Sequence, residues 1–373
     1  MNPSPRTRCW AEIDREALRH NARAVRAHVG PGVTLLAVVK ADGYGHGMGP
    51  VACALHESGA VRDFAVANLA EAVGLRGHLP GAAVTILSPA LPDERPGIVR
   101  HRFLPWVSGV AEAADYARLA ALQPATGPFE IVVAVDTGMG REGVLPAGLP
   151  ALLAAAGAMP TLRVRGVVTH LPSADEDAAF TADQLGRFDA LLESAPPAAE
   201  RHAQNSAGLL GFAPGARLNV VRPGLSLYGA SPLPGFQGSL RPVLTLKTRV
   251  SLVRALPAGH GVGYGRTFVT PRPMRVGTLA AGYADGYPRH LSNVGAEVLV
   301  RGRRCPVLGR VTMDQIMIDL DALPDVDAGE EVVLLGRQGA EEVPAAELAA
   351  RSGTIPWEIF TGLSARVGRY YFG

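Results

Sequence analysis

The chain has 373 residues, which is enough for two domains of ordinary size. Hydrophobic residues make up 47% of it and charged residues 19%, so a large packed core is expected. The formal net charge of +2 is too small to favour nucleic acid or an anionic membrane as a partner.

Lysine and cysteine are rare in this chain. Lys40 and Lys247 are the only lysines, so a catalytic amine has two candidates. Three cysteines lie far apart without a C-x-x-C pair, which argues against a disulfide framework or a structural zinc and favours a reducing, cytoplasmic location: Cys9, Cys53 and Cys305. The N-terminus lacks the apolar segment of a signal peptide, and no run approaches the length of a membrane span.

The first two-thirds of the chain alternates apolar runs with helical patterns. Asp14 is expected to cap a helix that ends at Gly30-Pro31. The next run, 33–39, is continuously apolar, as expected of a buried parallel strand. Similar runs follow at 64–67, 83–87, 102–107, 129–135, 162–168, 201–203 and 218–221, with helical patterns at 111–122, 149–156 and 179–192. Eight strands interleaved with helices predict an α/β fold, a TIM-like (β/α)8 barrel.

A second domain is predicted in the last third. Around residues 231–239 the sequence becomes rich in Pro and Gly with little periodicity, which indicates a boundary. Strand-like runs dominate beyond it, together with one helix at 345–350; the runs are 243–253, 274–281, 297–300, 316–320 and 331–335. This pattern predicts a mainly antiparallel β domain of ordinary size.

Polar residues close most of the predicted barrel strands, and catalytic groups of such barrels gather at that end. Taken in chain order they are Lys40, Asn68, Asp136, His170, Asn205-Ser206 and Arg222. An amine at a buried strand end has its pKa lowered, because desolvation disfavours the charged form, and a neutral amine forms Schiff bases. The alternative for Lys40 is a side chain that extends to solvent. For Lys247, in the middle of a strand, a solvent-facing side chain is expected.

A phosphate group would require backbone N–H groups from a glycine turn, together with hydroxyl groups. Gly224, the Ser206 hydroxyl and the Tyr44 hydroxyl are suitable, although Pro223-Gly224 also fits an ordinary turn. The histidines show no metal-ligand spacing and no H-E-x-x-H motif occurs, so no metal site is predicted.

Residues 38–47, VVKADGYGHG, closely resemble the pyridoxal-phosphate attachment segment of alanine racemases. Further matches follow in the order of that family and cover nearly the whole chain: residues 136–141, 169–170, 174–175, 205–206, 221–224, 263–267, 282–287, 309–310 and 313–315. A single motif would be weak, but an ordered set across two domains is specific to the family.

The resemblance implies a barrel over residues 11–236 and a mainly β domain over 237–373, which residues 1–10 join as a strand. It implies pyridoxal 5'-phosphate held as a Schiff base on Lys40, and interconversion of L- and D-alanine that supplies D-alanine for peptidoglycan. It further implies a head-to-tail homodimer, with Tyr264 of one copy reaching the site that contains Lys40 of the other.

The same resemblance assigns the acid–base roles. Lys40 is expected to remove the Cα proton from D-alanine, and Tyr264 that from L-alanine. Tyr264 needs a cationic or hydrogen-bonding neighbour, and His170, linked to Arg222, is the family's candidate. Arg222 is implied beside the pyridine nitrogen. Because arginine only donates and stays charged, that nitrogen should remain unprotonated, which suppresses transamination.

The remaining roles are carried over by position. The residues implied to hold the cofactor phosphate are Tyr44, Ser206, Gly224 and Leu225. Arg141 is expected to approach the cofactor's phenolic oxygen and the substrate carboxylate, which the backbone of Met313 also contacts. The implied access corridor for the substrate consists of Tyr283, Asp175, Arg289 and Arg310.

Two positions depart from the family pattern. Many members carry a lysine two residues before the Asp-Thr-Gly segment, modified to a carbamate that orients the arginine. Ala134 stands at that place, so Arg141 must be oriented by something else, such as a bound chloride. Trp357 replaces the usual tyrosine near the C-terminus, and has an indole N–H donor but no hydroxyl. This change affects both the phosphate contact and the size of the pocket.

Three other functions remain as alternatives. One is a broad-specificity racemase acting on serine, lysine or arginine. A decarboxylase of the same fold would need a catalytic cysteine late in the chain and an acidic partner for the pyridine nitrogen, whereas Cys305 lacks the context and Arg222 is basic. A non-catalytic pyridoxal-phosphate carrier would resemble only the first domain, and residues 239–373 count against it.

Overall fold

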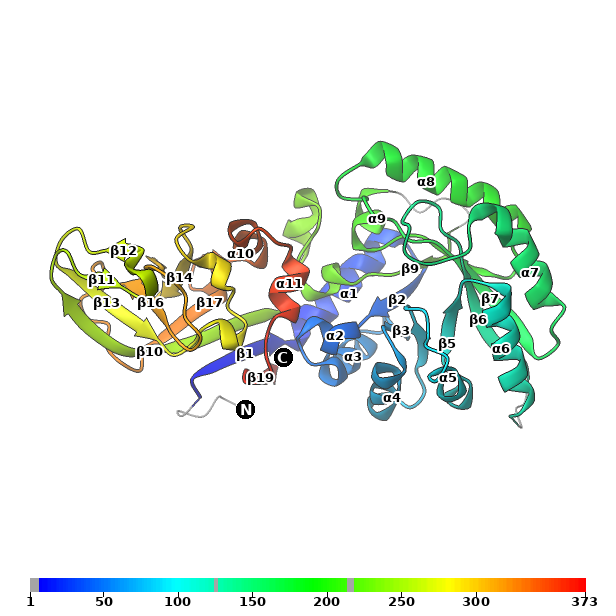
Figure 1. Cartoon of the computed structure of the whole chain (residues 1–373), viewed down its shortest axis with the longest axis horizontal. Coiled ribbons are helices and arrows are strands. Elements are labelled where there is room, and N and C mark those ends of the chain that lie inside the picture. The colour runs from blue at the N-terminus through cyan, green and yellow to red at the C-terminus, as the bar shows by residue number, and fades with distance from the viewer. Residues whose placement is uncertain (1–6, 124–126, 213–217) are drawn as a thin grey trace. The chain divides into compact units, whose positions relative to one another are not determined.

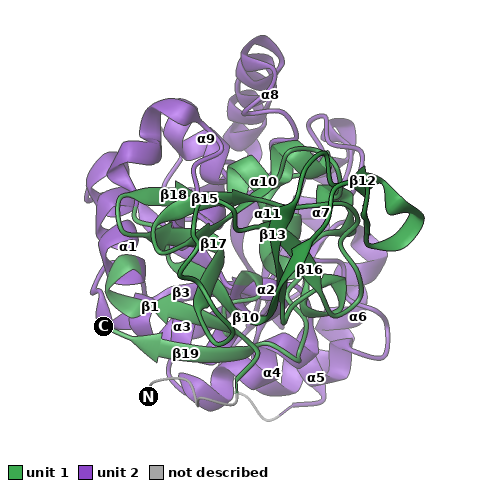
Figure 2. Ribbon diagram, turned by 90° about the vertical axis from the view of Figure 1, so that its left-hand side faces the viewer, with its two compact units in different colours: residues 1–17, 44–47, 241–373 green, residues 18–43, 48–240 purple. Residues whose placement is uncertain are grey.

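The computed structural model describes residues 7–123, 127–212 and 218–373. The chain divides by its contacts into two compact units, which Figure 2 colours separately. The barrel unit comprises residues 18–43 and 48–240, and the β unit comprises the residues up to 17, 44–47 and 241–373. The sequence analysis predicted domain boundaries after residue 10 and after residue 236, and these boundaries remain predictions.

The barrel unit contains a closed barrel of parallel strands, eight among the described residues (Figure 1). The strands are β2 (Thr34–Val38), β3 (Asp63–Val66), β4 (Ala83–Ile86), β5 (Leu104–Val107), β6 (Phe129–Ala134), β7 (Leu162–Val168), β8 (Glu200–His202) and β9 (Val220–Val221). The barrel closes where Leu35 of β2 pairs with Val221 of β9. The predicted (β/α)8 barrel is confirmed.

Helices surround the barrel strands (Figure 1). Up to residue 240 the α-helices are α1 (Arg15–Val29), α2 (Lys40–Tyr44), α3 (Met48–Glu57), α4 (Leu69–His78), α5 (Arg95–His101), α6 (Val110–Ala121), α7 (Leu149–Gly157), α8 (Ala178–Leu191) and α9 (Ser206–Gly211). The predicted cap of α1 is present, since the Asp14 carboxylate accepts the Ala17 N–H at 3.0 Å. In the part of the chain that is described, no helix has the length and apolarity needed to cross a membrane.

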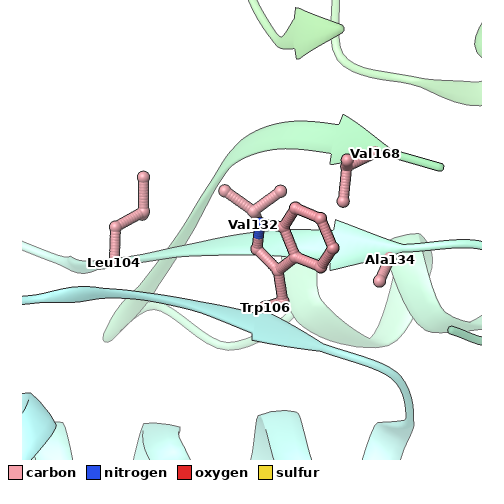
Figure 3. Close-up of a cluster of buried hydrophobic side chains, with 5 residues drawn as sticks. All are labelled: Leu104, Trp106, Val132, Ala134 and Val168. Atoms are coloured by element: carbon pink, nitrogen blue, oxygen red, sulfur yellow. The ribbon is translucent and has the colours of Figure 1, made fainter. Parts of the chain in front are cut away.

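Apolar side chains of successive strands fill the barrel. Figure 3 shows one such cluster, formed by Leu104 and Trp106 of β5, Val132 and Ala134 of β6, and Val168 of β7. All five are buried, and each large apolar side chain removed from water contributes about 1.5–3 kcal/mol. The apolar interior leaves the carboxyl ends of the strands as the place where polar groups gather.

The β unit is built on a nine-stranded sheet. Its strands and those of a two-stranded ribbon are β1 (Cys9–Asp14), β10 (Leu244–Leu256), β11 (Gly261–Val262), β12 (Phe268–Val269), β13 (Met274–Leu279), β14 (Glu297–Val300), β15 (Arg303–Pro306), β16 (Ile316–Asp319), β17 (Glu331–Gln338), β18 (Glu341–Val343) and β19 (Gly368–Phe372). Its α-helices are α10 (Ala345–Ser352) and α11 (Pro356–Thr361). β1 lies between β10, to which it is antiparallel, and β19, to which it is parallel.

Candidate active site

Lys40 lies two residues after the end of β2 and opens an unusual backbone turn. The next three residues have φ values of 52°, 53° and 61°, in the left-handed region. Each non-glycine residue in that conformation costs about 1–2 kcal/mol, so the turn must be held by its contacts. The Gly43 N–H donates to the Val39 carbonyl at 2.9 Å, and the Met48 N–H donates to the Asp42 carboxylate at 2.9 Å. Strain of this kind is typical of functional sites.

Glu71 holds the start of this turn. Its carboxylate accepts the Ala41 N–H and the Ala67 N–H, each at 2.8 Å, and so links the residue after Lys40 to the end of β3. Burial lowers the pKa of the Lys40 amine, and the nearby Arg141 lowers it further, against the opposing charges of Glu71 and Glu142. The amine is therefore neutral at a lower pH than an ordinary lysine, as a nucleophilic amine requires.

Three of the polar residues at strand ends stabilise local backbone. Asn68 and Asn205 cap α4 and α9 by accepting the N–H groups of Glu71 at 3.0 Å and Gly208 at 2.9 Å. The Asp136 carboxylate accepts three successive N–H groups, from residues 138 to 140, at 2.8–2.9 Å. Their side chains therefore account for the shapes of loops at the barrel mouth rather than for a reaction.

The buried Arg222 pairs with the partly buried His170 at the same end of the barrel. Arg222 Nη2 lies 3.2 Å from His170 Nδ1 and also donates to the carbonyls of Thr169 at 2.8 Å and Ala203 at 3.1 Å. Burial, and then the charge of Arg222, lower the pKa of His170 to about 2, while burial lowers that of Arg222 to about 9. His170 is thus neutral near pH 7. Because arginine can only donate, Nδ1 accepts and the ring proton resides on Nε2.

A third set of groups surrounds the Ser206 hydroxyl. Its oxygen accepts the N–H groups of Gly224 at 3.0 Å and Ser226 at 3.3 Å. Leu225 begins the 3-10 helix η3 (Leu225–Tyr228) directly after Gly224. The structure therefore brings together three of the four residues expected to hold a phosphate: Ser206, Gly224 and Leu225.

The fourth residue, Tyr44, belongs by its contacts to the β unit. The Trp357 indole N–H donates to its phenol, which is buried, and burial raises the pKa of that phenol above its usual range. Trp357, one of the two residues at which this chain departs from the family pattern, thus contacts a predicted phosphate ligand. Trp357 lies in α11, whose pattern the sequence analysis did not recognise as a helix.

Residues 44–47 are held by the last residues of the chain. The Arg369 Nε donates to the Gly45 carbonyl at 3.2 Å, and the Tyr371 hydroxyl donates to the His46 carbonyl at 3.1 Å. A Cβ on Gly45 would lie 2.2 Å from the Phe360 carbonyl oxygen, so only glycine fits there. The loop that follows Lys40 is therefore fixed by the C-terminal part of the β unit.

The β unit gathers several of the other predicted residues. A Cβ on Gly265, next to Tyr264, would lie 3.0 Å from the Arg310 guanidinium. The Tyr283 N–H donates to the Thr312 carbonyl at 3.0 Å, beside Met313. Tyr264 is 72% exposed, Met313 52% and Tyr283 40%. Arg289 is exposed in the 3-10 helix η7 (Arg289–Leu291), and in the barrel unit Asp175 is exposed between β7 and α8.

The sequence analysis expected Lys247 to face solvent, and this prediction is wrong. Its amine pairs with Glu12 at 2.9 Å and Glu331 at 3.1 Å, and its side chain is only 16% exposed. Burial works against its charge, but the hydrogen bonds that the amine donates to the two carboxylates outweigh burial and raise its pKa. Among the described residues, no group of three His, Cys, Asp or Glu side chains is placed to hold a metal ion.

A barrel that presents a deprotonatable lysine after its first strand, joined in sequence to a β unit, defines a class of lysine-dependent cofactor enzymes. The model of the alanine racemase N-terminal domain matches residues 13–232, and that of the C-terminal domain matches residues 243–371. The chain belongs to the alanine racemase family. Members of this family depend on pyridoxal phosphate.

This chain is similar to known relatives and to solved structures over nearly its full length. The alanine racemase of Symbiobacterium thermophilum is 44% identical over 377 residues, covering 98% of this chain and 97% of the relative. The crystal structure of alanine racemase from Streptomyces lavendulae matches with a TM-score of 0.91 and 35% identity, covering 100% of this chain and 98% of the other. That from Bartonella henselae, with covalently bound pyridoxal phosphate, matches with a TM-score of 0.88 and 30% identity, covering 99% and 100%.

Proposed function

We propose that this protein interconverts L- and D-alanine, with pyridoxal phosphate attached covalently to Lys40. The observation that carries the proposal is the partly buried amine of Lys40 just past the end of β2, whose pKa is lowered by burial and by Arg141. Membership of the alanine racemase family supports alanine as the substrate, and the broader-specificity, decarboxylase and carrier alternatives are not favoured. We further propose a cytoplasmic enzyme whose D-alanine product supplies peptidoglycan synthesis.

The described side chains fit the cofactor. Arg222 Nη1 is buried and has no hydrogen-bond partner among the described residues, so it can donate to a ring nitrogen. The Ser206 hydroxyl, whose oxygen accepts the Gly224 N–H, is a donor suited to a phosphate. The residues that would hold the cofactor are Lys40, Tyr44, His170, Ser206, Arg222, Gly224, Leu225 and Trp357. When bound, the group withdraws electrons from the substrate's Cα and so acidifies its proton.

The two opposed acid–bases are Lys40 and Tyr264. The Lys40 amine takes the Cα proton of D-alanine and returns a proton to the same face in the reverse direction, while the Tyr264 phenol serves the L-face. The His170 Nε2–H can donate a hydrogen bond to the deprotonated phenol and so stabilise it. Arg141 would bind the substrate carboxylate, together with the backbone of Met313.

We propose a head-to-tail homodimer in which Tyr264 reaches the Lys40 site of a second copy. The exposure of Tyr264, Met313 and Tyr283 supports this arrangement, because exposed large apolar side chains that gather at one place mark association surfaces. Each site would then consist of residues from both chains, with the substrate corridor formed by Tyr283, Asp175, Arg289 and Arg310.

The activity is tested by incubating the purified, cofactor-loaded protein with L-alanine in deuterated buffer. We expect exchange of the α-hydrogen and formation of D-alanine without release of carbon dioxide. Decarboxylation, or cofactor binding without exchange, would refute the proposal. A turnover panel of alanine, serine, lysine and arginine then tests whether alanine is preferred.

Subunit complementation tests the shared site. Lys40→Ala and Tyr264→Phe homodimers should each be nearly inactive. After the two variants are mixed and allowed to exchange subunits, half of the dimers are hybrids with one intact site of two, so about a quarter of wild-type activity should return. No recovery, with hybrid dimers demonstrated by mass spectrometry, would show that Lys40 and Tyr264 act from the same chain.

A further inference from the structure

The carboxylate next to Arg141 is held against its guanidinium. The Glu142 Oε1 accepts from Arg141 Nη2 at 2.6 Å and from Arg141 Nε at 3.2 Å. The Glu142 side chain is only 7% exposed, whereas that of Arg141 is 51% exposed. Neighbouring residues usually point apart, so a buried carboxylate that turns back onto the preceding side chain is a specific arrangement.

The loop that carries this pair is tightly closed. The Asp136 N–H donates to the Val144 carbonyl and the Val144 N–H to the Ala134 carbonyl, each at 2.9 Å. The Gly143 N–H donates to the Ser108 hydroxyl at 3.0 Å. Gly143 has a φ of +101°, and a Cβ there would lie 2.7 Å from the Asp136 nitrogen. The backbone on both sides of Arg141 and Glu142 is therefore fixed, which gives the carboxylate a defined position.

Glu142 lines a small hollow over the end of β6. Ala134, Trp106 and His170 line the same hollow. Figure 3 shows the short Ala134 side chain beside the Trp106 indole, from neighbouring strands. Ala134 is where many family members have a modified lysine, so the Glu142 carboxylate lies beside the place that a longer side chain would fill.

The charge of Glu142 acts on the cationic groups of the barrel mouth. It raises the pKa of Lys40 and that of Arg222, against the effects of burial and of Arg141. Three cations close together repel one another, and a buried carboxylate among them offsets this repulsion. Removing that carboxylate would leave Arg141 free to swing to solvent, because half of its side chain is exposed.

We infer that Glu142 is the positioning residue for Arg141, holding its guanidinium for the substrate carboxylate in place of a modified lysine or a bound anion. This inference rests on the proposed function. It assigns to the chain's own side chain a negative charge that would otherwise have to come from carbon dioxide or from solution. Orientation of Arg141 in this protein then depends on neither bicarbonate nor chloride.

Steady-state kinetics of Glu142→Gln test the inference. The KM for L-alanine should rise about tenfold or more while kcat changes less, because ground-state orientation of the carboxylate is lost. Glu142→Asp keeps the charge and should give an intermediate KM. The matched control is Glu57→Gln, which removes the same charge from an exposed ion pair with Arg19 and should leave KM unchanged. Equal KM values for wild type and Glu142→Gln would overturn the assignment.

A second measurement needs no cofactor. Phenylglyoxal condenses with the nitrogens of a guanidinium group, and a carboxylate bound to two of these nitrogens hinders the reaction. In cofactor-free protein the labelling rate of Arg141, followed by peptide mass spectrometry, should rise severalfold in Glu142→Gln and stay at the wild-type rate in Glu57→Gln. An unchanged rate in Glu142→Gln would contradict the ion pair.

Replacing chloride with gluconate at constant ionic strength tests whether the Glu142 carboxylate or a bound chloride orients Arg141. The wild-type KM should stay constant. A KM that rises when chloride is removed would assign the role to a bound halide instead. A wild-type protein without racemase activity would refute the proposed function, whereas an active wild type with an unaffected Glu142→Gln variant would refute only the role of Glu142.

Discussion

The two lysines of this chain occupy opposite environments. Lys40 follows β2, where burial and Arg141 lower the pKa of its amine. Lys247 lies within β10, where Glu12 and Glu331 each accept a hydrogen bond from its amine and raise its pKa. Both amines are partly removed from water, so burial alone does not decide their behaviour. The difference lies in the neighbouring charges. Two adjacent carboxylates keep the Lys247 amine protonated in a structural ion pair, whereas the cationic Arg141 favours the neutral, nucleophilic form of the Lys40 amine.

The largest expected effect concerns the reaction itself. Lys40→Ala should lower racemisation in both directions by about 10⁴-fold or more and abolish the absorbance of bound cofactor, because no other amine can take its place. Lys247→Ala should leave the activity of the folded enzyme within about twofold of wild type. Racemisation assays and absorbance spectra of both variants check this. A Lys247→Ala enzyme that loses its cofactor would contradict the assignment of Lys40 as the catalytic lysine and Lys247 as a structural one.

Chemical reactivity should separate the same two amines in cofactor-free protein. Acetylation requires the neutral amine, so the labelling midpoint of Lys40 should lie below the ordinary value of 10.5 and that of Lys247 above it. At one pH, each unit between the two pKa values corresponds to about a tenfold difference in neutral amine. Mass spectrometry of the two peptides across pH gives both midpoints. Coincident midpoints would contradict the comparison.

His170 extends the comparison to a second group at the barrel mouth. With its pKa lowered to about 2 by burial and by Arg222, the imidazole should stay neutral from pH 5 to pH 8. Its NMR signals should not titrate in that window, whereas an ordinary histidine titrates near 6.5. In Arg222→Leu the midpoint should move upward, towards 6.5. Titration of His170 near pH 6.5 in wild type would show that the cationic surroundings have little effect.

The smallest effect is on stability. Lys247→Met should lower the free energy of unfolding by about 1 kcal/mol at pH 7. A lysine whose pKa is raised on folding contributes stability that is fully present below its unfolded pKa and is lost as pH rises through the folded value. The gap between wild type and variant should therefore be constant from pH 7 to pH 9 and shrink above about 10.5. Urea unfolding at several pH values measures this difference in unfolding free energy. A difference that grows at high pH would contradict a raised pKa for Lys247.

Much of the fold could be predicted because buried parallel strands are continuous apolar runs. Residues 33–39 and 129–135 stand out for this reason and contain β2 and β6. The sequence analysis named no strand at β11, β12, β15, β18 or β19, and no helix at α3, α4, α5, α9 or α11. A two-residue strand such as β11 is too short to show any periodicity, and β19 alternates too little in burial to reveal a buried face.

The site was only partly predictable. The motif around Lys40 and the strand-end position of Arg222 are local signals, and both residues lie at the end of the barrel that the sequence predicts. The pairing of Glu142 with Arg141 was missed, because adjacent residues rarely interact through their side chains. The only local sign of this pairing was that Glu142 directly follows Arg141, while Ala134 stands where many family members have the lysine that orients this arginine. The contact between Tyr44 and Trp357 joins residues far apart in sequence, and no local pattern predicts it.

The position of β1 between β10 and β19 has a consequence for synthesis on the ribosome. Strand β1 is made first, yet its parallel neighbour is made last, after residue 368. At translation rates of about 5–20 residues per second, one edge of β1 waits roughly 20–70 s for that neighbour. During this interval an unpaired strand edge is open to other nascent chains. Conditions that slow translation should therefore favour aggregation over the yield of native enzyme.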